Sequence, residues 1–168
     1  MKIQYETTAI STGGRDGKVA VENSQLEFQM APPAEMGGTK SGVNPEQLFA
    51  AGYSACFGSA VQHVVRLKKL TVQPPAIRVK IGIGRNDAGG YSLAADITAI
   101  FKGIDQETAD ALVNEAHQVC PYSNATRGNI DVNVTAKVES PKRRRSFSAF
   151  FALLCSIRKN QEDFIDIF

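Results

Sequence analysis

Residues 44–57, with the sequence NPEQLFAAGYSACF, predict the start of the long helix around which the rest of the chain is arranged. Asn44 suits the N-cap, Pro45 suits the first helical position, and Gln47 stands where a capping box requires it. One helix face carries a residue at every fourth position, namely Leu48, Gly52, Cys56, Ala60 and Val64. Cys56 therefore faces a packed neighbour, and the abundance of Ala, Gly and Ser allows another backbone to approach closely.

The chain before this helix predicts strands and a long loop. Residues 2–10 and 18–30 have the composition of strands, and Gly13-Gly14-Arg15-Asp16-Gly17 between them is a turn signal. This glycine-rich run lacks the Lys-Ser/Thr ending and the following helix of a phosphate-binding loop. Residues 31–43 contain Pro32-Pro33 and three glycines, and a loop of that length is usually functional or disordered.

The chain after the helix predicts a hairpin, a second helix and a last strand. Apolar residues alternate over 77–83 and 93–101 around a turn, and they alternate again over 130–138. Asp105 is placed to cap the second helix, which should bury Ala109, Leu112, Val113 and Ala116. Strands grouped in hairpins and two helices indicate an α+β fold, with antiparallel strands around the long central helix, and not a parallel βαβ fold.

A second cysteine ends the second helix. Residues 116–130 read AHQVCPYSNATRGNI, in which Pro121 disfavours helical geometry at Cys120. Taken singly, Cys56 and Cys120 are each best explained as small buried hydrophobic residues. Two thiols in apolar, turn-bounded surroundings also suit redox chemistry, because a thiolate reacts with peroxides and a second thiol can capture the sulfenic acid as a disulfide.

Spacing disfavours two other cysteine chemistries. His63 lies seven residues after Cys56, about 10 Å along a helix axis, which is too far for a cysteine–histidine nucleophilic pair within one helix. His117, Cys120 and Cys56 could share a metal ion, but no second close ligand pair completes a tetrahedral zinc set. We therefore expect no metal site.

Composition places the chain among single-domain globular proteins. Its 168 residues allow one hydrophobic core, and its formal net charge of +2 is more than supplied by the run Lys142-Arg143-Arg144-Arg145. The remainder is slightly acidic, which argues against nucleic acid as a partner. With no apolar run long enough to span a membrane and no secretory signal, we expect a cytoplasmic protein. In that reducing compartment its three cysteines form no structural disulfide framework.

The chain resembles the organic hydroperoxide resistance (Ohr) proteins of the OsmC/Ohr family. The similarity extends to about residue 138 and rests on residues 13–17, 44–57 and 116–130, the last of which favours the Ohr branch over the OsmC branch. The resemblance implies a cysteine-based peroxidase that reduces organic hydroperoxides in the oxidative stress response. It also implies the OsmC/Ohr-like fold and an intertwined homodimer with active sites at the subunit interface.

The resemblance also implies roles for individual residues. Cys56 matches the peroxidatic cysteine and Cys120 the resolving cysteine of a redox-active disulfide, while Arg15 and Glu46 match the pair that activates the thiol. No bound cofactor is implied; an external dithiol of the dihydrolipoamide type, carried by a lipoyl-bearing protein, recycles the enzyme. Candidates for apolar contacts with an alkyl or lipid hydroperoxide are Phe49, Phe57 and Tyr122.

Physical chemistry agrees with these roles. Free cysteine is mostly protonated at neutral pH, and an Arg15 guanidinium held by Glu46 would stabilise the thiolate. Cys120 ends a helix, where the dipole disfavours a thiolate, which suits a resolving cysteine.

Glu46 and Cys56 are about 15 Å apart along a straight helix. We therefore expect antiparallel helices in a dimer to bring Glu46 of one chain to Cys56 of the other, and a bend near Gly52 is the alternative.

Two further functions stay open on the sequence. An OsmC-type peroxidase would differ in its peroxide preference. A non-enzymatic thiol redox sensor or binding module would use the same disulfide as a switch. Turnover separates them, because a sensor is oxidised once per molecule whereas an enzyme consumes many equivalents of peroxide with a dithiol.

Residues 141–168 depart from the family pattern. After the basic run they contain an apolar stretch of eleven residues, 147–157, with Cys155 inside it. We expect residues 1–140 to form the peroxidase domain and this tail to be disordered or loosely packed.

A chain truncated after Ser140 should keep its peroxidase activity in a steady-state assay and gain solubility, because an apolar patch is removed. Loss of activity in a folded truncated chain would show that the tail belongs to the site.

Overall fold

The computed structural model describes residues 1–39 and 41–140, which form two three-stranded sheets and three α-helices. The first sheet contains β1 (Ala9–Thr12), β2 (Lys18–Val21) and β3 (Glu27–Gln29). The second contains β4 (Ala76–Arg85), β5 (Tyr91–Lys102) and β6 (Asp131–Glu139). The helices are α1 (Pro45–Leu67), α2 (Gln106–Val119) and α3 (Pro121–Thr126). The predicted α+β class is confirmed.

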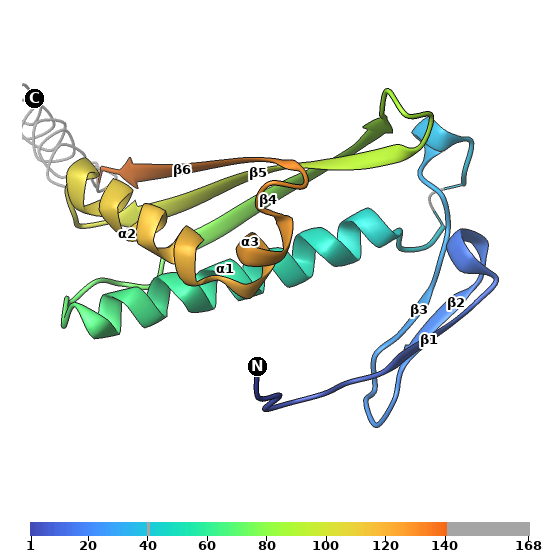
Figure 1. Ribbon diagram of the computed structural model, residues 1–168, viewed down its shortest axis with the longest axis horizontal. Helices are drawn as coiled ribbons and strands as arrows, with labels where there is room; N and C mark the ends of the chain where they lie inside the picture. The colour runs from blue at the N-terminus through green and yellow to red at the C-terminus, as the bar shows by residue number, and fades with distance from the viewer. Residues whose placement is uncertain (40, 141–168) are drawn as a thin grey trace, which may run out of the picture.

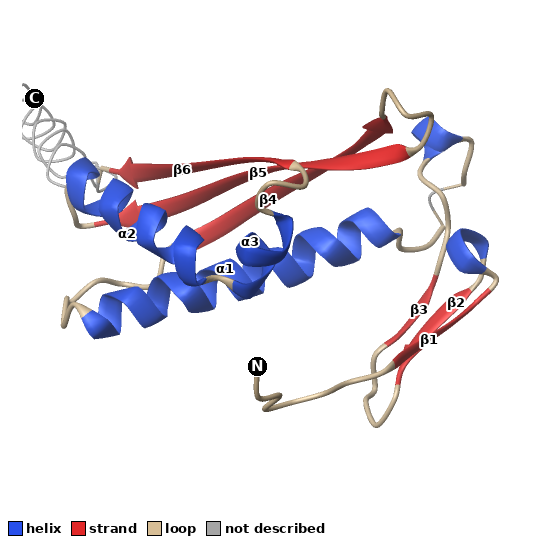
Figure 2. Ribbon diagram, viewed as in Figure 1, coloured by secondary structure: helices blue, strands red, loops and turns tan. Residues whose placement is uncertain are grey.

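Two layers make up the body of the molecule. Figure 1 shows α1 and α2 on the same face of the β4–β5–β6 sheet, with α3 between them. The first sheet stands away from this body, beside the N-terminal end of α1, and Figure 2 shows the strands of the two sheets as two separate groups of red arrows. The chain that leads from β3 to α1 connects the two.

The sequence signals at the start of α1 are confirmed. The Asn44 side chain accepts a hydrogen bond from the Gln47 N–H, and the Gln47 side chain accepts one from the Asn44 N–H, both at 2.9 Å. Pro45 occupies the first helical position. At the other end, Lys69 adopts a left-handed φ of 53°, which stops the helix. Cys56 accordingly lies in the middle of a 23-residue helix.

The core lies between the helices and the second sheet. From α1 it receives Tyr53, Phe57, Ala60, Val61 and Val64. From α2 it receives the four residues predicted to point inward, Ala109, Leu112, Val113 and Ala116. Full burial of each large apolar side chain stabilises the fold by about 1.5–3 kcal/mol, so this layer fixes α1 and α2 against the strands.

One pairing in the second sheet differs from the antiparallel expectation. β4 and β5 form the predicted hairpin, but β6 pairs parallel to β5, with Ala94 opposite Asp131 and Lys102 opposite Glu139. The physical reason is the connection: α2 and α3 carry the chain back along the sheet, so β6 starts at the same end as β5.

The first sheet also differs in detail from the prediction. The strand expected over 2–10 is limited to β1, and the strand expected over 18–30 is two strands separated by a turn. Asn23 makes this turn at a φ of 55°, a conformation that asparagine tolerates better than most residues. Among the described residues, none of this sheet belongs to the buried core, and Ile10 and Leu26 are more than half exposed. Within the described part of the chain, this sheet adds no residue to the core cluster between the helices and the second sheet.

The predictions for the C-terminal tail fall outside the described residues, which end at Ser140. Over residues 1–39 and 41–140, no helix combines the length and apolar character needed to cross a membrane.

Candidate active site

Cys56 and Cys120 are neighbours in space. Cys56 is half-buried on α1, and Cys120 is completely buried at the junction of α2 and α3. Their Sγ atoms are 3.5 Å apart, and both thiols are free. Because sulfur atoms in a disulfide are about 2.0 Å apart, closing this pair requires a relative shift of only about 1.5 Å. The two thiols are therefore close enough for a disulfide to form between them after a small movement.

Pro121 accounts for the position of Cys120. As predicted, α2 ends before the proline, and Cys120 has an extended ψ of 122°. Pro121 then opens α3, a short helix that the sequence patterns did not predict. The chain turns sharply at Cys120, so the buried thiol is presented to α1 and not to solvent.

The surroundings of Cys56 in one chain oppose ionisation. Burial raises the pKa of the Cys56 thiol, and a hydrogen bond from the backbone N–H of Tyr122 lowers it by a smaller amount. The result is a pKa above that of an ordinary cysteine. A Cys56 thiolate at neutral pH therefore needs further positive charge.

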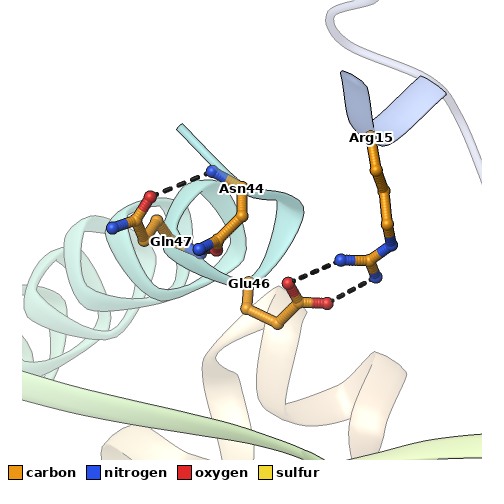
Figure 3. A network of polar contacts seen from close by, with 4 residues as sticks. All are labelled: Arg15, Asn44, Glu46 and Gln47. Atoms are coloured by element: carbon orange, nitrogen blue, oxygen red, sulfur yellow. Dashed lines mark hydrogen bonds and ion pairs between the residues drawn. The ribbon is translucent and has the colours of Figure 1, made fainter. Parts of the chain in front are cut away.

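Arg15 and Glu46 form a two-pronged ion pair at the start of α1. The guanidinium donates from Nη1 to one carboxylate oxygen at 2.9 Å and from Nη2 to the other at 2.6 Å, as Figure 3 shows. This hydrogen bonding holds the pKa of Glu46 below its usual value, against the opposing effect of partial burial. The predicted partnership of the two residues thus exists within a single chain. The ion pair fixes the plane of the guanidinium.

The glycines around Arg15 shape the loop that carries it. Arg15 lies in the short 3-10 helix η1 (Gly14–Asp16), inside the predicted turn between β1 and β2. Gly13 has a φ of 80°, which suits glycine, and a Cβ at Gly17 would lie 1.8 Å from the Thr12 carbonyl oxygen. The glycine-rich run is therefore required by the geometry that points Arg15 at α1.

Three aromatic rings cover α1 between Glu46 and Cys56. Phe49, Tyr53 and Tyr122 have ring centroids 5.6–5.8 Å apart. Tyr122 lies across Gly52, where a Cβ would come within 3.1 Å of its hydroxyl oxygen. Because Gly52 has no side chain, the Tyr122 ring can pack directly against α1.

Phe49 also lines a cavity of about 320 Å³ at the Arg15–Glu46 end of the helix. Its other walls come from Pro45 and from the β4–β5 hairpin, through Ile83, Tyr91, Ser92 and Leu93. The walls are largely apolar, with the ion pair at one side. The two cysteines do not line it.

Other predicted residues lie elsewhere. Phe57, expected to contact substrate, is fully buried in the core, because it falls on the face of α1 that packs against the sheet. His63 is exposed, and His117 is half-buried with a pKa lowered by burial and by the Arg127 charge. Within residues 1–39 and 41–140, no three or more His, Cys, Asp or Glu side chains cluster as metal ligands would.

The comparisons with known proteins agree with this architecture. A family model described as OsmC-like protein matches residues 38–135. The chain belongs to the OsmC/Ohr family. It is 46% identical over 137 residues to "Organic hydroperoxide resistance protein-like 2" of Staphylococcus epidermidis, an alignment that covers 79% of this chain and 96% of the relative.

Solved structures give the same result. A putative organic hydroperoxide resistance protein from Vibrio cholerae superposes with a TM-score of 0.78 at 46% identity, covering 81% of this chain and 94% of that one. An organic hydroperoxide resistance protein from Elizabethkingia anophelis superposes with a TM-score of 0.79 at 45% identity, covering 83% and 100%. The predicted family is confirmed, and its relatives carry names of organic hydroperoxide resistance.

Sequence reasoning overlooked a set of polar residues after Cys120. Ser123 and Thr126 bond to the buried Tyr53 hydroxyl, and Arg127 bonds back to α2. A usable signal was present, since Ser123 and Thr126 are three residues apart and would share one face of a helix starting at Pro121. The resemblance to the family rests on this run, but no helix is assigned to it in the sequence analysis.

The ion pair predicts a pH-dependent stability difference. A carboxyl whose pKa is lowered by folding stabilises the fold above its unfolded pKa, and this contribution is lost as the pH falls through the folded pKa. Glu46→Gln should therefore lower the free energy of unfolding at pH 7, by less than about 1 kcal/mol because Arg15 is partly exposed. The difference in free energy of unfolding between Glu46→Gln and wild type should become smaller as the pH falls below 4.5, the ordinary pKa of a glutamate.

Urea unfolding of both proteins at several pH values measures this difference in unfolding free energy. The matched control is Glu22→Gln, which changes an exposed glutamate of the same N-terminal region. A difference that stays constant from pH 7 to pH 3 would show that the Arg15–Glu46 ion pair is not its source.

Proposed function

We propose that this protein is a thiol peroxidase that reduces organic hydroperoxides to alcohols. The observation that carries the proposal is the 3.5 Å separation of two free thiols, one half-buried and one fully buried, in a chain of the OsmC/Ohr family. The difference in burial suggests how the roles divide. Cys56 is the thiol that peroxide can reach, and Cys120 is shielded from it.

The first chemical step oxidises Cys56. Its thiolate attacks the outer oxygen of the hydroperoxide, so that an S–O bond forms and the O–O bond breaks. The alkoxide leaves and takes up a proton to become the alcohol. Cys56 becomes a sulfenic acid. The Tyr122 N–H, which already donates to Cys56, stabilises negative charge on the attacking sulfur.

The second step forms the Cys56–Cys120 disulfide. The Cys120 sulfur bonds to the sulfenic sulfur, the S–O bond breaks, and the hydroxyl leaves with the Cys120 proton as water. An external dithiol reopens the disulfide by exchange through a mixed disulfide. We propose a dihydrolipoamide-type dithiol on a lipoyl-bearing protein as this reductant, with no cofactor bound to the enzyme. A reducing cytoplasm would keep both thiols reduced between turnovers.

Apolar surroundings support an organic substrate. Phe49 and Tyr122 present rings beside the path from Glu46 to Cys56, and Ile83 and Leu93 extend the apolar surface into the cavity of about 320 Å³. Burial of an alkyl chain there would favour alkyl or lipid hydroperoxides over hydrogen peroxide, at about 0.8 kcal/mol for each buried CH₂ group.

Two features support an intertwined homodimer with shared sites. Over residues 1–39 and 41–140, the first sheet, whose β1–β2 loop carries Arg15, contributes nothing to the core, and an isolated sheet of this size needs a surface to pack on. The Arg15–Glu46 pair lies about 15 Å along α1 from Cys56, so it does not supply the positive charge that Cys56 needs in the same chain. In our proposal the pair of one protomer activates Cys56 of the other.

Substitution of each thiol tests the proposed chemistry. Cys56→Ser should abolish consumption of cumene hydroperoxide in a dihydrolipoamide-coupled assay, because the attacking sulfur is gone. Cys120→Ser should consume one equivalent and accumulate a sulfenic acid that dimedone traps at Cys56. Dimedone labelling of Cys120 in wild type would reverse the roles. A wild-type protein that stops after one equivalent despite excess dithiol would be a redox sensor and not an enzyme.

Mixed dimers test whether the sites are shared. Glu46→Ala and Cys56→Ser chains are each expected to be nearly inactive. If Glu46 of one protomer serves Cys56 of the other, heterodimers of the two variants should regain one working site of the two. The measurement is peroxide consumption by heterodimers purified through two different affinity tags. Verified heterodimers without activity would place Glu46 and Cys56 of one site in the same chain.

A further inference from the structure

The corner between α2 and α3 is held by a side chain to which the proposed mechanism assigns no role. Arg127 follows α3, and its Nη2 donates to the carbonyl oxygen of His117 at 2.5 Å. Its Nη1 donates to the Asn124 side-chain oxygen at 2.9 Å. His117 lies three residues before Cys120 and Arg127 seven after it. The guanidinium therefore bridges the two helices across the position of the buried thiol.

A second set of bonds fixes α3 to α1. The Tyr53 hydroxyl lies 3.0 Å from the Ser123 hydroxyl and 3.2 Å from that of Thr126. All three residues are buried, and Tyr53 lies about one helical turn before Cys56. Buried hydroxyl bonds of this kind are costly to break without replacement, so α3 has a defined place on the helix that carries Cys56.

The two sets of bonds form one connected path between the thiols. Tyr53 joins α1 to α3, and Arg127 joins α3 to the last turn of α2, which ends at Cys120. The backbone at Cys120 is tied in the same way, donating to Ala116 and accepting from Asn124, each at 2.9 Å. The relative position of the two sulfur atoms thus depends on α3 and on the Arg127 bridge.

We propose that Arg127 is a positioning residue for the resolving step, which holds the end of α2 so that Cys120 stays within bonding reach of Cys56. This inference rests on the proposed peroxidase function. In the step concerned, the Cys120 sulfur is oxidised as it bonds to the sulfenic sulfur of Cys56, which is reduced, and the hydroxyl leaves as water with the Cys120 proton. Arg127 touches neither sulfur and acts only through the backbone of α2.

The exposure of Arg127 decides where its effect should appear. A hydrogen bond from an exposed side chain adds little to global stability. A displacement of about 1 Å between reacting atoms, in contrast, can slow a reaction by up to about a hundredfold. Loss of the bridge should therefore slow disulfide closure far more than it lowers the melting temperature, and it should leave the attack of Cys56 on peroxide at its normal rate.

The experiment compares Arg127→Gln, Arg127→Lys and Arg78→Gln with wild type. Arg78 is the matched control, an exposed arginine of β4 outside the site. Reduced protein is mixed with one equivalent of cumene hydroperoxide and quenched at intervals with dimedone or an alkylating reagent. Mass spectrometry then gives the rates of sulfenic acid formation at Cys56 and of disulfide closure separately.

We expect Arg127→Gln to form sulfenic acid at the wild-type rate and to close the disulfide about ten- to a hundredfold more slowly. Arg127→Lys should recover part of the closure rate, because one ammonium group can reach one of the two acceptors. Arg78→Gln should match wild type in both steps. Closure at the wild-type rate in folded Arg127→Gln would overturn the proposal, as would equal slowing of both steps, which indicates a merely structural role.

Two further measurements keep the test decisive. If Arg127→Gln does not fold, Asn124→Ala removes one acceptor of the guanidinium, and an unchanged closure rate in that variant would overturn the proposal. If wild type forms no sulfenic acid, the proposed peroxidase function fails, and the positioning role is then tested without peroxide. A mixed disulfide of Cys56 with glutathione should still be displaced by Cys120 more slowly in Arg127→Gln, and equal rates would reject the role.

Discussion

The conformational restriction that Pro121 imposes on Cys120 determines most of the candidate site. A residue before proline is driven out of the helical region, so α2 has to end at Cys120. The same proline is well suited to begin a new helix, so α3 starts without any intervening loop. The result is a rigid corner with a buried thiol at its apex, seated against α1 at the level of Cys56.

The electrostatics of the site divide it into two parts. Burial raises the pKa of Cys56, while the cation suited to stabilise a thiolate is engaged by Glu46 about three helical turns away. A hydrogen bond from a charged donor contributes about 1.5–3 kcal/mol, equivalent to a ten- to hundredfold change in the thiolate population. A guanidinium within hydrogen-bonding distance of Cys56 would therefore raise its thiolate population by that factor and oppose the effect of burial.

The parts of the fold that could be predicted are those governed by local chemistry. The Asn44–Gln47 capping box located α1, and the Asp105 cap together with a regular apolar spacing located α2 and its buried face. The parallel partner of β6 could not be predicted, because alternation identifies a strand but not its neighbour. The division of 18–30 at Asn23 depended on a single left-handed residue inside an otherwise strand-like run.

The same distinction holds for the site. Residues recognised by their type and motif, Cys56, Cys120, Arg15 and Glu46, lie in two close pairs. For residues chosen only as apolar neighbours, the position around the helix decides whether the side chain contacts the core or the site. Phe49 falls beside the cavity, whereas Phe57, eight residues later, falls in the core. The polar contacts of α3 could not be predicted, because this six-residue helix is too short to show a repeating apolar pattern.

Association with a second chain would supply both a packing surface for the first sheet and a positive charge for Cys56. Among the described residues, the first sheet and its turns expose apolar side chains such as Ile10 and Leu26 and add nothing to the core, and no cation contributes to the pKa of Cys56. Because Arg15 is carried by a loop of this sheet, any surface that buries the sheet also fixes the guanidinium in space. In the proposed dimer that surface belongs to the partner, so the free energy of association would also complete the site. Folding of the N-terminal region, assembly and activation of the thiol would then be thermodynamically linked, and dilution would weaken all three together.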